Sequence, residues 1–205
     1  ITEMMNMNFE ISKRLFDKGL YWNKKIIFAS SASVYGSAGI PSNLYGWSKY
    51  CAEQYGLALA KNYRVFNDRK FIALRYFNVY GPGEGHKGEM SSVAERAFGK
   101  SVMKLFPGSP RRDFVFIDDV VAANLYAIDN NIETGFYDVG TGEANSFEQV
   151  CTHMNVPFEY KDRSEIPKGY QFFTEAKGKH WMSGWTPKFD LKDGLSKYML
   201  YLEQH

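Results

Sequence analysis

A tyrosine and a lysine four positions apart are the clearest chemical pair in the chain. Tyr45 and Lys49 lie in YGWSKYCAEQYGLALAKNY (45–63), whose apolar spacing predicts a helix. Positions i and i+4 of a helix share one face, so both side chains would project one turn apart. An ammonium there stabilises a phenolate, which makes the tyrosine usable as an acid or a base.

A serine at the end of a strand would complete the constellation. The segment KKIIFASS contains a continuous apolar run, which predicts a parallel strand buried on both faces. Ser31 at its end would orient a substrate hydroxyl or carbonyl beside Tyr45. The spacing alone is weak evidence, because Tyr21 and Lys25 repeat it elsewhere in the chain.

The elements around these residues alternate between helix and strand. A helix is expected up to Gly19, followed by the strand KKIIFASS, the helix at 45–63 and a second buried strand in KFIALRYFNVYG (70–81). This order is typical of βαβ units and predicts an α/β fold with a parallel sheet. Further helices are expected in residues 118–131, in a segment with Ser146 as N-cap, and in residues 190–204.

The composition indicates a globular protein without a strong electrostatic field. The 205 residues, 44% of them hydrophobic, can bury a sizeable core in roughly one domain. A net charge of +2 disfavours nucleic acid and anionic membranes as partners. Two distant cysteines and four unpaired histidines argue against a disulfide framework or a metal site. Since neither a membrane-length apolar run nor a signal peptide is visible, a reducing, cytoplasmic location is expected.

Glycine spacing in GPGEGHKG (81–88) matches the G-x-G-x-x-G pattern of a dinucleotide-binding loop. It follows a late strand, however, and Pro82 breaks the tight turn that a pyrophosphate loop needs. No segment before residue 80 has the strand, glycine-rich turn and acidic residue of such a unit. Three interpretations stay open: a cofactor loop that precedes Ile1, residues left out of the sequence, or a protein that binds no dinucleotide.

Four motifs in order give the chain a family resemblance. SSASVYG, YGWSK, LRYFNVYGPGE and RRDFVFIDDV resemble the extended short-chain dehydrogenase/reductase family of NAD-dependent nucleotide-sugar epimerases and dehydratases. The resemblance implies that Ser31, Tyr45 and Lys49 are catalytic. It also implies a Rossmann-type doubly wound parallel sheet that holds NAD or NADP, with amino-terminal strands absent from this chain, and a smaller α+β substrate region.

The same resemblance divides the chain between cofactor and substrate. Residues 1–80 and 115–140 would form the C-terminal part of the Rossmann domain, and residues 81–114 and 141–205 the nucleotide-sugar region. Cofactor contacts are implied at Tyr45, Lys49, Asn78 and Val79. Substrate contacts are implied at Ser31, Asn78, Glu89, Arg96, Phe106, Gly108, Ser109, Arg112 and Tyr170. A homo-oligomer is expected as well.

Within the family, RYFNVYGPGEGHKGEMSSVAERAF resembles the heptose 6-epimerase branch. That branch implies ADP-heptose as substrate, a role in lipopolysaccharide synthesis, and transient oxidation by NAD(P) with hydride returned to the opposite face. The lysine of Gly-His-Lys-Gly, here Lys87, would be the second acid or base, which requires burial or a cationic neighbour. The loop 81–88 is then a substrate-side loop. A sugar 4-epimerase or 4,6-dehydratase is the alternative, and a truncated, non-catalytic binding module is the second.

Several positions have competing interpretations. Arg112 would grip a diphosphate with its planar fork, or else pair with Asp113 or Asp118 on the surface. Glu89 and Arg96 stand where the heptose branch has a serine and a histidine, so the substrate pocket is not copied intact. Finally, Tyr76, Phe77, Phe114 and Phe116 are expected in the core, and Asp118 and Asp119 are expected to cap the following helix.

Overall fold

The computed structural model describes residues 2–36, 39–62 and 70–205. Its contacts divide the chain into two compact units. Unit 1 consists of residues Ile1–Tyr76, Ala123–Asp138 and Lys179–Trp185, and unit 2 of Phe77–Ala122, Val139–Gly178 and Thr186–His205. Both contain parallel strand pairs, so the predicted α/β fold with a parallel sheet is confirmed.

Unit 1 is built on a three-stranded sheet. Its strands are β1 (Ile26–Ser31), β2 (Phe71–Tyr76) and β6 (Gly135–Val139), in the order β1-β2-β6. β1 and β2 run parallel, with Ser30 opposite Arg75 and Ser31 opposite Tyr76. The register therefore places the end of β1, where the predicted serine lies, next to the end of β2.

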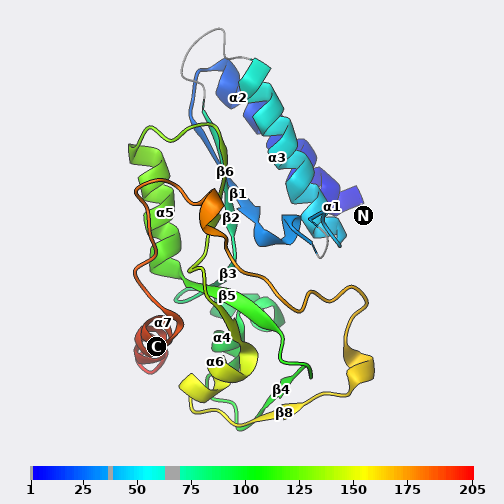
Figure 1. The fold of residues 1–205 in the computed structure, drawn as a ribbon, viewed down its shortest axis with the longest axis vertical. Helices are drawn as coiled ribbons and strands as arrows, with labels where there is room; N and C mark the ends of the chain where they lie inside the picture. Colours follow the sequence, from blue (N-terminus) through cyan, green and yellow to red (C-terminus); the bar gives the residue numbers. More distant parts are fainter. Residues whose placement is uncertain (1, 37–38, 63–69) are drawn as a thin grey trace. The chain divides into compact units, whose positions relative to one another are not determined.

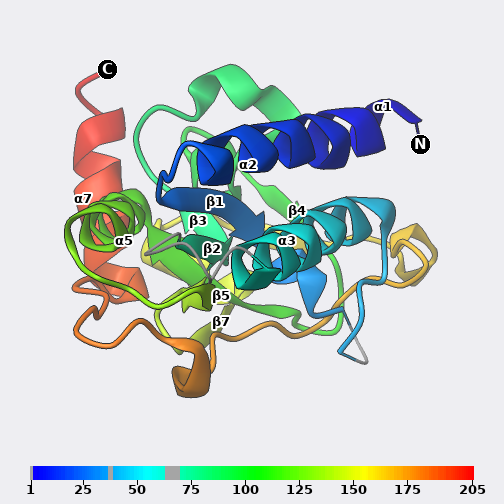
Figure 2. The ribbon, with the colours of Figure 1, turned by 90° about the horizontal axis from the view of Figure 1, so that it is seen from above.

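Two helical segments pack beside this sheet. The first consists of α1 (Thr2–Met5), a π-helical turn (Asn6–Glu10) and α2 (Ile11–Tyr21), and the second is α3 (Leu44–Asn62). Figures 1 and 2 show α2 and α3 running beside β1. The core between them consists of Phe16, Leu20, Phe28, Ala52, Ala60, Phe71 and Ala73. Edge-to-face rings such as Phe16 and Phe71, with centroids 4.9 Å apart, fill it closely.

Burial of β1 on both faces, expected from its apolar run, is wrong. Its side chains alternate instead: Phe28 and Ser30 are buried, while Ala29 between them is exposed. This is the two-residue period of a strand with one covered face. The strand buried throughout is β2, in which Phe71–Arg75 are all buried between two neighbouring strands.

Unit 2 combines two small sheets with short helices. One sheet has the order β3 (Asn78–Tyr80), β5 (Arg111–Phe116) and β7 (Ala144–Ser146), and the other pairs β4 (Met103–Leu105) with β8 (Phe158–Tyr160). Its helices are α4 (Val93–Ala97), α6 (Phe147–His153) and α7 (Leu191–Leu202), and it holds the start of α5 (Ile117–Asp129). Short helical turns of the chain cover Ala32–Val34, Gly85–Met90, Arg163–Glu165 and Gly178–His180.

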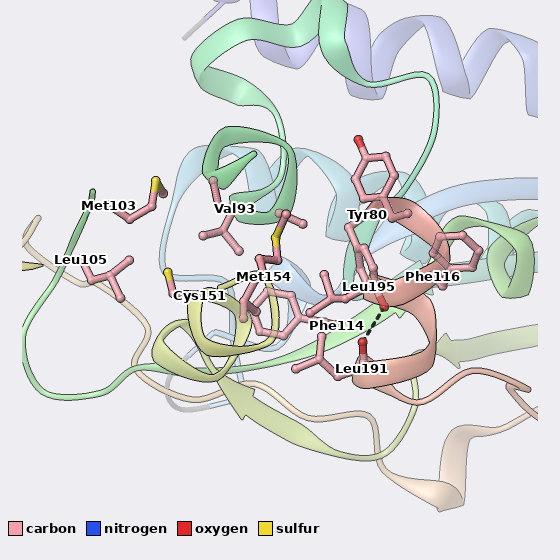
Figure 3. Packing of buried hydrophobic residues seen from close by; sticks show 14 residues of the cluster. Tyr80, Val93, Met103, Leu105, Phe114, Phe116, Cys151, Met154, Leu191 and Leu195 are labelled. Carbon is pink, nitrogen blue, oxygen red and sulfur yellow. Dashed lines mark hydrogen bonds between the residues drawn. The ribbon is translucent and has the colours of Figure 1, made fainter. Parts of the chain in front are cut away.

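The core of unit 2 gathers side chains from β3, β5, α6 and α7 (Figure 3). Tyr80 packs against Phe116 and donates a hydrogen bond of 3.4 Å to the carbonyl of Leu191. Ser146 is the N-cap of α6, as predicted, and its capping-box partner is Gln149. Asp190 is likewise the N-cap of α7, so both helices begin at a capping side chain.

The acidic pair at the start of α5 does not cap it. Both residues lie in the first turn: Asp119 accepts hydrogen bonds from the backbone N–H groups of Lys188 (2.9 Å) and Phe189 (3.0 Å), and Asp118 pairs with Lys197 at 2.5 Å. The carboxylates thus hold the chain that leads into α7. Of the expected core aromatics, Phe77, Phe114 and Phe116 are buried, whereas Tyr76 is half-buried.

Two features are absent from the described part of the chain, a membrane-spanning helix and a cluster of metal-ligating side chains. No helix there is long and apolar enough to cross a bilayer. The described residues also contain no group of three or more histidine, cysteine or carboxylate side chains that could hold a metal ion.

Candidate functional site

Tyr45 lies in the first turn of α3, and its ring is 40% exposed. The helix begins where the Asn43 side chain accepts a hydrogen bond of 2.8 Å from the Gly46 N–H. A Cβ atom on Gly46 would lie 2.4 Å from the carbonyl oxygen of Ser33. The turn that carries Tyr45 therefore packs directly on the segment that follows Ser31.

Ser31 ends β1 and begins a short helical turn. Its hydroxyl accepts a hydrogen bond from the Ser33 N–H and donates one to the Ser33 hydroxyl, both 3.2 Å long. These contacts are local, so the hydroxyl is held in place by its own turn. The structure thus brings Ser31 and Tyr45 onto adjoining turns of one unit.

Lys49 lies one helical turn after Tyr45 and faces β1. Its Nζ atom donates a hydrogen bond of 3.0 Å to the carbonyl of Ala29 and lies 5.1 Å from the Phe28 ring centroid and 5.9 Å from that of Tyr45. Burial lowers the pKa of Lys49 from its ordinary value. The predicted neighbourhood of ammonium and phenol is therefore present.

The donors of this trio suit a dinucleotide ribose. An ammonium has three N–H donors, and the described structure uses one of them on the carbonyl of Ala29. The other donors, together with the hydroxyl of Tyr45, a residue that is 40% exposed, fit the hydroxyl oxygens of a sugar. The residues present are thus compatible with a nicotinamide cofactor in unit 1.

One buried charged contact close to the trio Ser31, Tyr45 and Lys49 was not indicated by any motif in the sequence. Glu53, 0% exposed, receives two hydrogen bonds from Arg75, from Nε at 2.9 Å and from Nη2 at 2.6 Å. The hydroxyl of Ser30 donates to the same carboxylate at 2.5 Å. The available signal was position: Glu53 follows Lys49 by one turn and sits between Ala52 and Gly56, which are both buried.

Lys87 lies in unit 2, on a loop closed by Glu84. The buried carboxylate of Glu84 accepts hydrogen bonds from the backbone N–H of Gly81 (3.3 Å), the N–H of Ser92 (2.8 Å) and the hydroxyl of Ser92 (2.6 Å). Lys87 is half-exposed, with Nζ 4.0 Å from Glu84. Among the described residues its neighbour is thus a carboxylate, whereas a cationic neighbour or burial was expected. Glu89 is exposed on the same loop.

Arg112 is buried without a carboxylate partner in the described structure. Its guanidinium donates to two backbone carbonyls, those of Arg111 (3.0 Å) and Gln171, so the pairing with Asp113 or Asp118 weighed above is not observed. It lies 5.2 Å from the Tyr170 ring centroid, and Tyr170 in turn meets Phe106 at 5.2 Å. Burial lowers the pKa of Arg112. Three predicted substrate residues therefore form one cluster.

Further residues predicted to contact the substrate or the cofactor lie elsewhere in unit 2. Gly108 and Ser109 form a turn with positive φ angles of 94° and 46°, and Ser109 donates a hydrogen bond of 3.3 Å to Glu148. Asn78 and Val79 lie in β3, with Asn78 exposed. Arg96 lies in α4, and its Nε atom is buried without a described hydrogen-bond partner.

Comparison with known proteins gives a family match and a curated relative. The model of the "NAD dependent epimerase/dehydratase family" matches residues 1–140. The chain is 35% identical, over 225 aligned residues, to the ADP-L-glycero-D-manno-heptose-6-epimerase of Brachyspira hyodysenteriae. The alignment covers 98% of this chain and 70% of that protein.

Solved structures show the same likeness. The ADP-L-glycero-D-manno-heptose-6-epimerase of Helicobacter pylori superposes with a TM-score of 0.78 at 28% identity, covering 98% of this chain. The chain spans 66% of the length of that structure. MoeE5 in complex with UDP-glucuronic acid and NAD gives a TM-score of 0.78 at 25% identity, over 96% of this chain and 71% of that one.

Proposed function

Because the chain belongs to the NAD-dependent epimerase/dehydratase family, we propose that it acts as a nucleotide-sugar epimerase with NAD or NADP. The curated relative and one of the solved structures carry the name of a heptose 6-epimerase. ADP-heptose is therefore the substrate that we propose to test first. In this proposal residues 1–80 and 115–140 belong to a Rossmann-type cofactor domain, and residues 81–114 and 141–205 contribute the nucleotide-sugar region.

The observation that carries the proposal is the buried Arg112. A buried cation normally pairs with an anion, because desolvation without a counter-charge is costly. Arg112 is 8% exposed, and in the described structure it donates only to neutral carbonyls. The diphosphate of a nucleotide sugar would supply the missing charge, and a planar guanidinium can bind two of its oxygens. Tyr170 and Phe106 beside it would cover the ligand.

The trio of unit 1 would handle the proton. Tyr45, exposed and beside an ammonium, would take or give the proton at a sugar hydroxyl, while the Ser31 hydroxyl orients that group. Lys49 would hold both the phenol and the cofactor ribose. The nicotinamide, when bound, supplies the acceptor and donor of hydride. Asn78 and Val79 are proposed as further cofactor contacts.

Lys87 is proposed as the second proton-transfer group. An epimerase needs acid and base function on both faces of the reacting carbon, or a substrate that turns within the site. The loop held by Glu84 presents Lys87 half-exposed, so its side chain is accessible to a ligand, and the bound ligand would supply the burial that this role requires. Glu89, Arg96, Gly108 and Ser109 are proposed as further substrate contacts.

Tyr45→Phe tests the proposal directly. Loss of general acid-base function typically costs about 10²- to 10⁴-fold in rate. We expect kcat for ADP-heptose, followed by NMR of the product, to fall within that range while calorimetry shows unchanged nucleotide-sugar binding. Tyr50→Phe, on the same helix, is the matched control. Full activity of Tyr45→Phe would refute the assignment, and turnover at C4 of a UDP-sugar instead would identify a 4-epimerase.

A further inference from the structure

The buried face of α3 carries one long side chain among small ones. The buried residues of the helix are Gly46, Ser48, Ala52, Glu53, Gly56 and Ala60. Small residues let the helix approach the sheet closely: a Cβ atom on Gly56 would lie 2.2 Å from the Phe71 ring. They also form shallow ridges, which give the helix little to interlock with along its axis. Among these buried residues, Glu53 is the one whose side chain forms hydrogen bonds to the strands.

Glu53 binds two neighbouring strands at one level. Oε1 accepts from Ser30 of β1 and from Arg75 of β2, and Oε2 accepts from Arg75 as well. Ser30 and Arg75 are opposite partners in the parallel register of β1 and β2. The carboxylate is thus bound one residue before Ser31 along β1.

Arg75 is itself confined. Its guanidinium lies 3.6 Å from the ring centroid of Phe136 and 4.7 Å from that of Tyr35. The hydroxyl of Tyr35 donates a hydrogen bond of 2.5 Å to Asp138, which is buried. The guanidinium contacts two aromatic rings and the Glu53 carboxylate. Only one orientation of the side chain makes all of these contacts.

We propose that Glu53 is a positioning residue: its contacts with Ser30 and Arg75 fix α3 along β1, so that Tyr45 and Lys49 are presented to Ser31. Tyr45, Lys49 and Glu53 follow each other at intervals of one helical turn, so a shift at Glu53 moves the whole face. A misplacement of about 1 Å can cost 100-fold in rate. The inference rests on the proposed function, since it assigns a task to the same trio.

A buried ion pair also has a purely structural explanation, and a double variant separates the two. Replacing a buried pair by apolar side chains of similar size often leaves stability unchanged, because no charge is left unpaired. We expect the double variant Glu53→Met/Arg75→Met to unfold at nearly the wild-type urea midpoint. Its kcat should be at most about a tenth of the wild-type value, with KM within about twofold. Wild-type kcat in the folded double variant would overturn the proposal.

Ser30→Ala decides the matter should the double variant not fold. It removes the hydroxyl that joins β1 to Glu53 and leaves the ion pair with Arg75 intact. We expect a measurable fall in kcat with an unchanged KM. Wild-type kcat in Ser30→Ala would contradict the role of the strand contact.

Tyr55→Phe is the matched control on the same helix. Tyr55 donates a hydrogen bond of 2.5 Å to Asp17 of α2, so its loss loosens α3 from α2 and leaves the contacts of Glu53 in place. We expect wild-type kcat. A fall as large as that of Ser30→Ala would show that any weakened contact of α3 has this effect, and the positioning role would be wrong.

A readout without turnover distinguishes this inference from the proposed function. Lys49 is half-buried and bonded to Ala29, so an amine-acylating reagent should label it slowly, which peptide mass spectrometry can follow. We expect several-fold faster labelling in the double variant and in Ser30→Ala. If the wild type epimerises no nucleotide sugar while labelling responds in this way, the proposed function fails and the positioning role stands. Unchanged labelling would overturn the positioning role.

Discussion

Two fully buried carboxylates, one in each unit, hold the molecule in different ways. Glu53 in unit 1 receives side chains that project from two strands. Asp113 in unit 2 receives backbone N–H groups, from Thr141 (2.7 Å), Gly142 (2.8 Å) and Ala176 (3.1 Å), and the hydroxyl of Thr141 (2.8 Å). The first fixes the register of regular elements, and the second fixes the shape of loops.

The difference matches what each unit is proposed to do. Proton transfer requires fixed distances, and the residues proposed for it lie on a strand and a helix. The residues proposed for substrate binding, such as Arg112 and Tyr170, lie beside segments that Asp113 holds through backbone contacts. Burial is the largest influence on Asp113 and raises its pKa, while its hydrogen bonds act in the opposite direction. Because Asp113 holds these loops through their main chain, their side chains can be substituted without losing its hydrogen bonds.

Asp113→Ala should have the largest effect on stability. It removes the carboxylate from three backbone donors, that of Ala176 buried and those of Thr141 and Gly142 partly buried, and a buried donor left unsatisfied costs about 1–3 kcal/mol. We expect the free energy of unfolding, measured in urea, to fall by about 3–5 kcal/mol. A loss below about 1 kcal/mol would mean that water replaces the carboxylate, and that the loops of unit 2 are not held as described.

Gly56→Ala tests the close packing in unit 1. Alanine favours helices over glycine by about 1 kcal/mol, but here its methyl group would overlap the Phe71 ring. Overpacking costs about 1–3 kcal/mol, so we expect net destabilisation in urea melts. Adding Phe71→Leu should recover part of the loss. Stabilisation by Gly56→Ala would show that α3 has room to move, which breaks the contrast between the units.

Arg112→Lys tests the substrate cluster by a milder change. A lysine keeps the charge but cannot donate in a planar fork to the carbonyls of Arg111 and Gln171 and to a diphosphate. We expect KM for the nucleotide sugar to rise about tenfold, the equivalent of about 1.4 kcal/mol, with kcat nearly unchanged. A tenfold fall in kcat would instead indicate that Arg112, like Tyr45, takes part in the catalytic step.

The smallest expected effect is a pH dependence due to Lys49. Because burial lowers its pKa below 10.5, the folded chain releases this proton at lower pH than the unfolded chain does. Between the two pKa values the unfolded chain binds more protons, so the free energy of unfolding rises with pH. The free energy of unfolding of the wild type, minus that of Lys49→Met, should therefore rise as the pH approaches 10.5 in urea melts. A flat difference would mean that Lys49 is fully hydrated.

Much of the fold was predictable because spacing reports local structure. The periodicity of residues 45–63 predicted α3 close to its bounds, and Ser146 predicted the start of α6. The single strand expected in 70–81 is wrong: the run forms two strands, β2 and β3, which belong to different sheets. The burial of β1 was wrong because four apolar residues in a row do not say whether both faces of a strand are covered. Ala29 is small enough to be exposed without penalty.

The candidate site was predictable where its residues are close in sequence. Tyr45 and Lys49 share a helix face by spacing alone. Glu53 and Arg75 were missed, because a charged residue in a helical pattern is normally assigned to the surface and its partner lies 22 positions away. Likewise, nothing local to Arg112 indicates that it is buried against Tyr170 instead of paired with Asp113.

The closed loop around Glu84 has a consequence for how specificity can diverge. Its two ends, Gly81 and Ser92, are both bonded to one buried carboxylate, while residues 85–90 between them are exposed. Exchanging those six positions therefore leaves the anchor and the core intact. Under the proposed function, libraries that vary this loop, Glu89 included, and keep Lys87 are a route to new sugar preferences at little risk to folding.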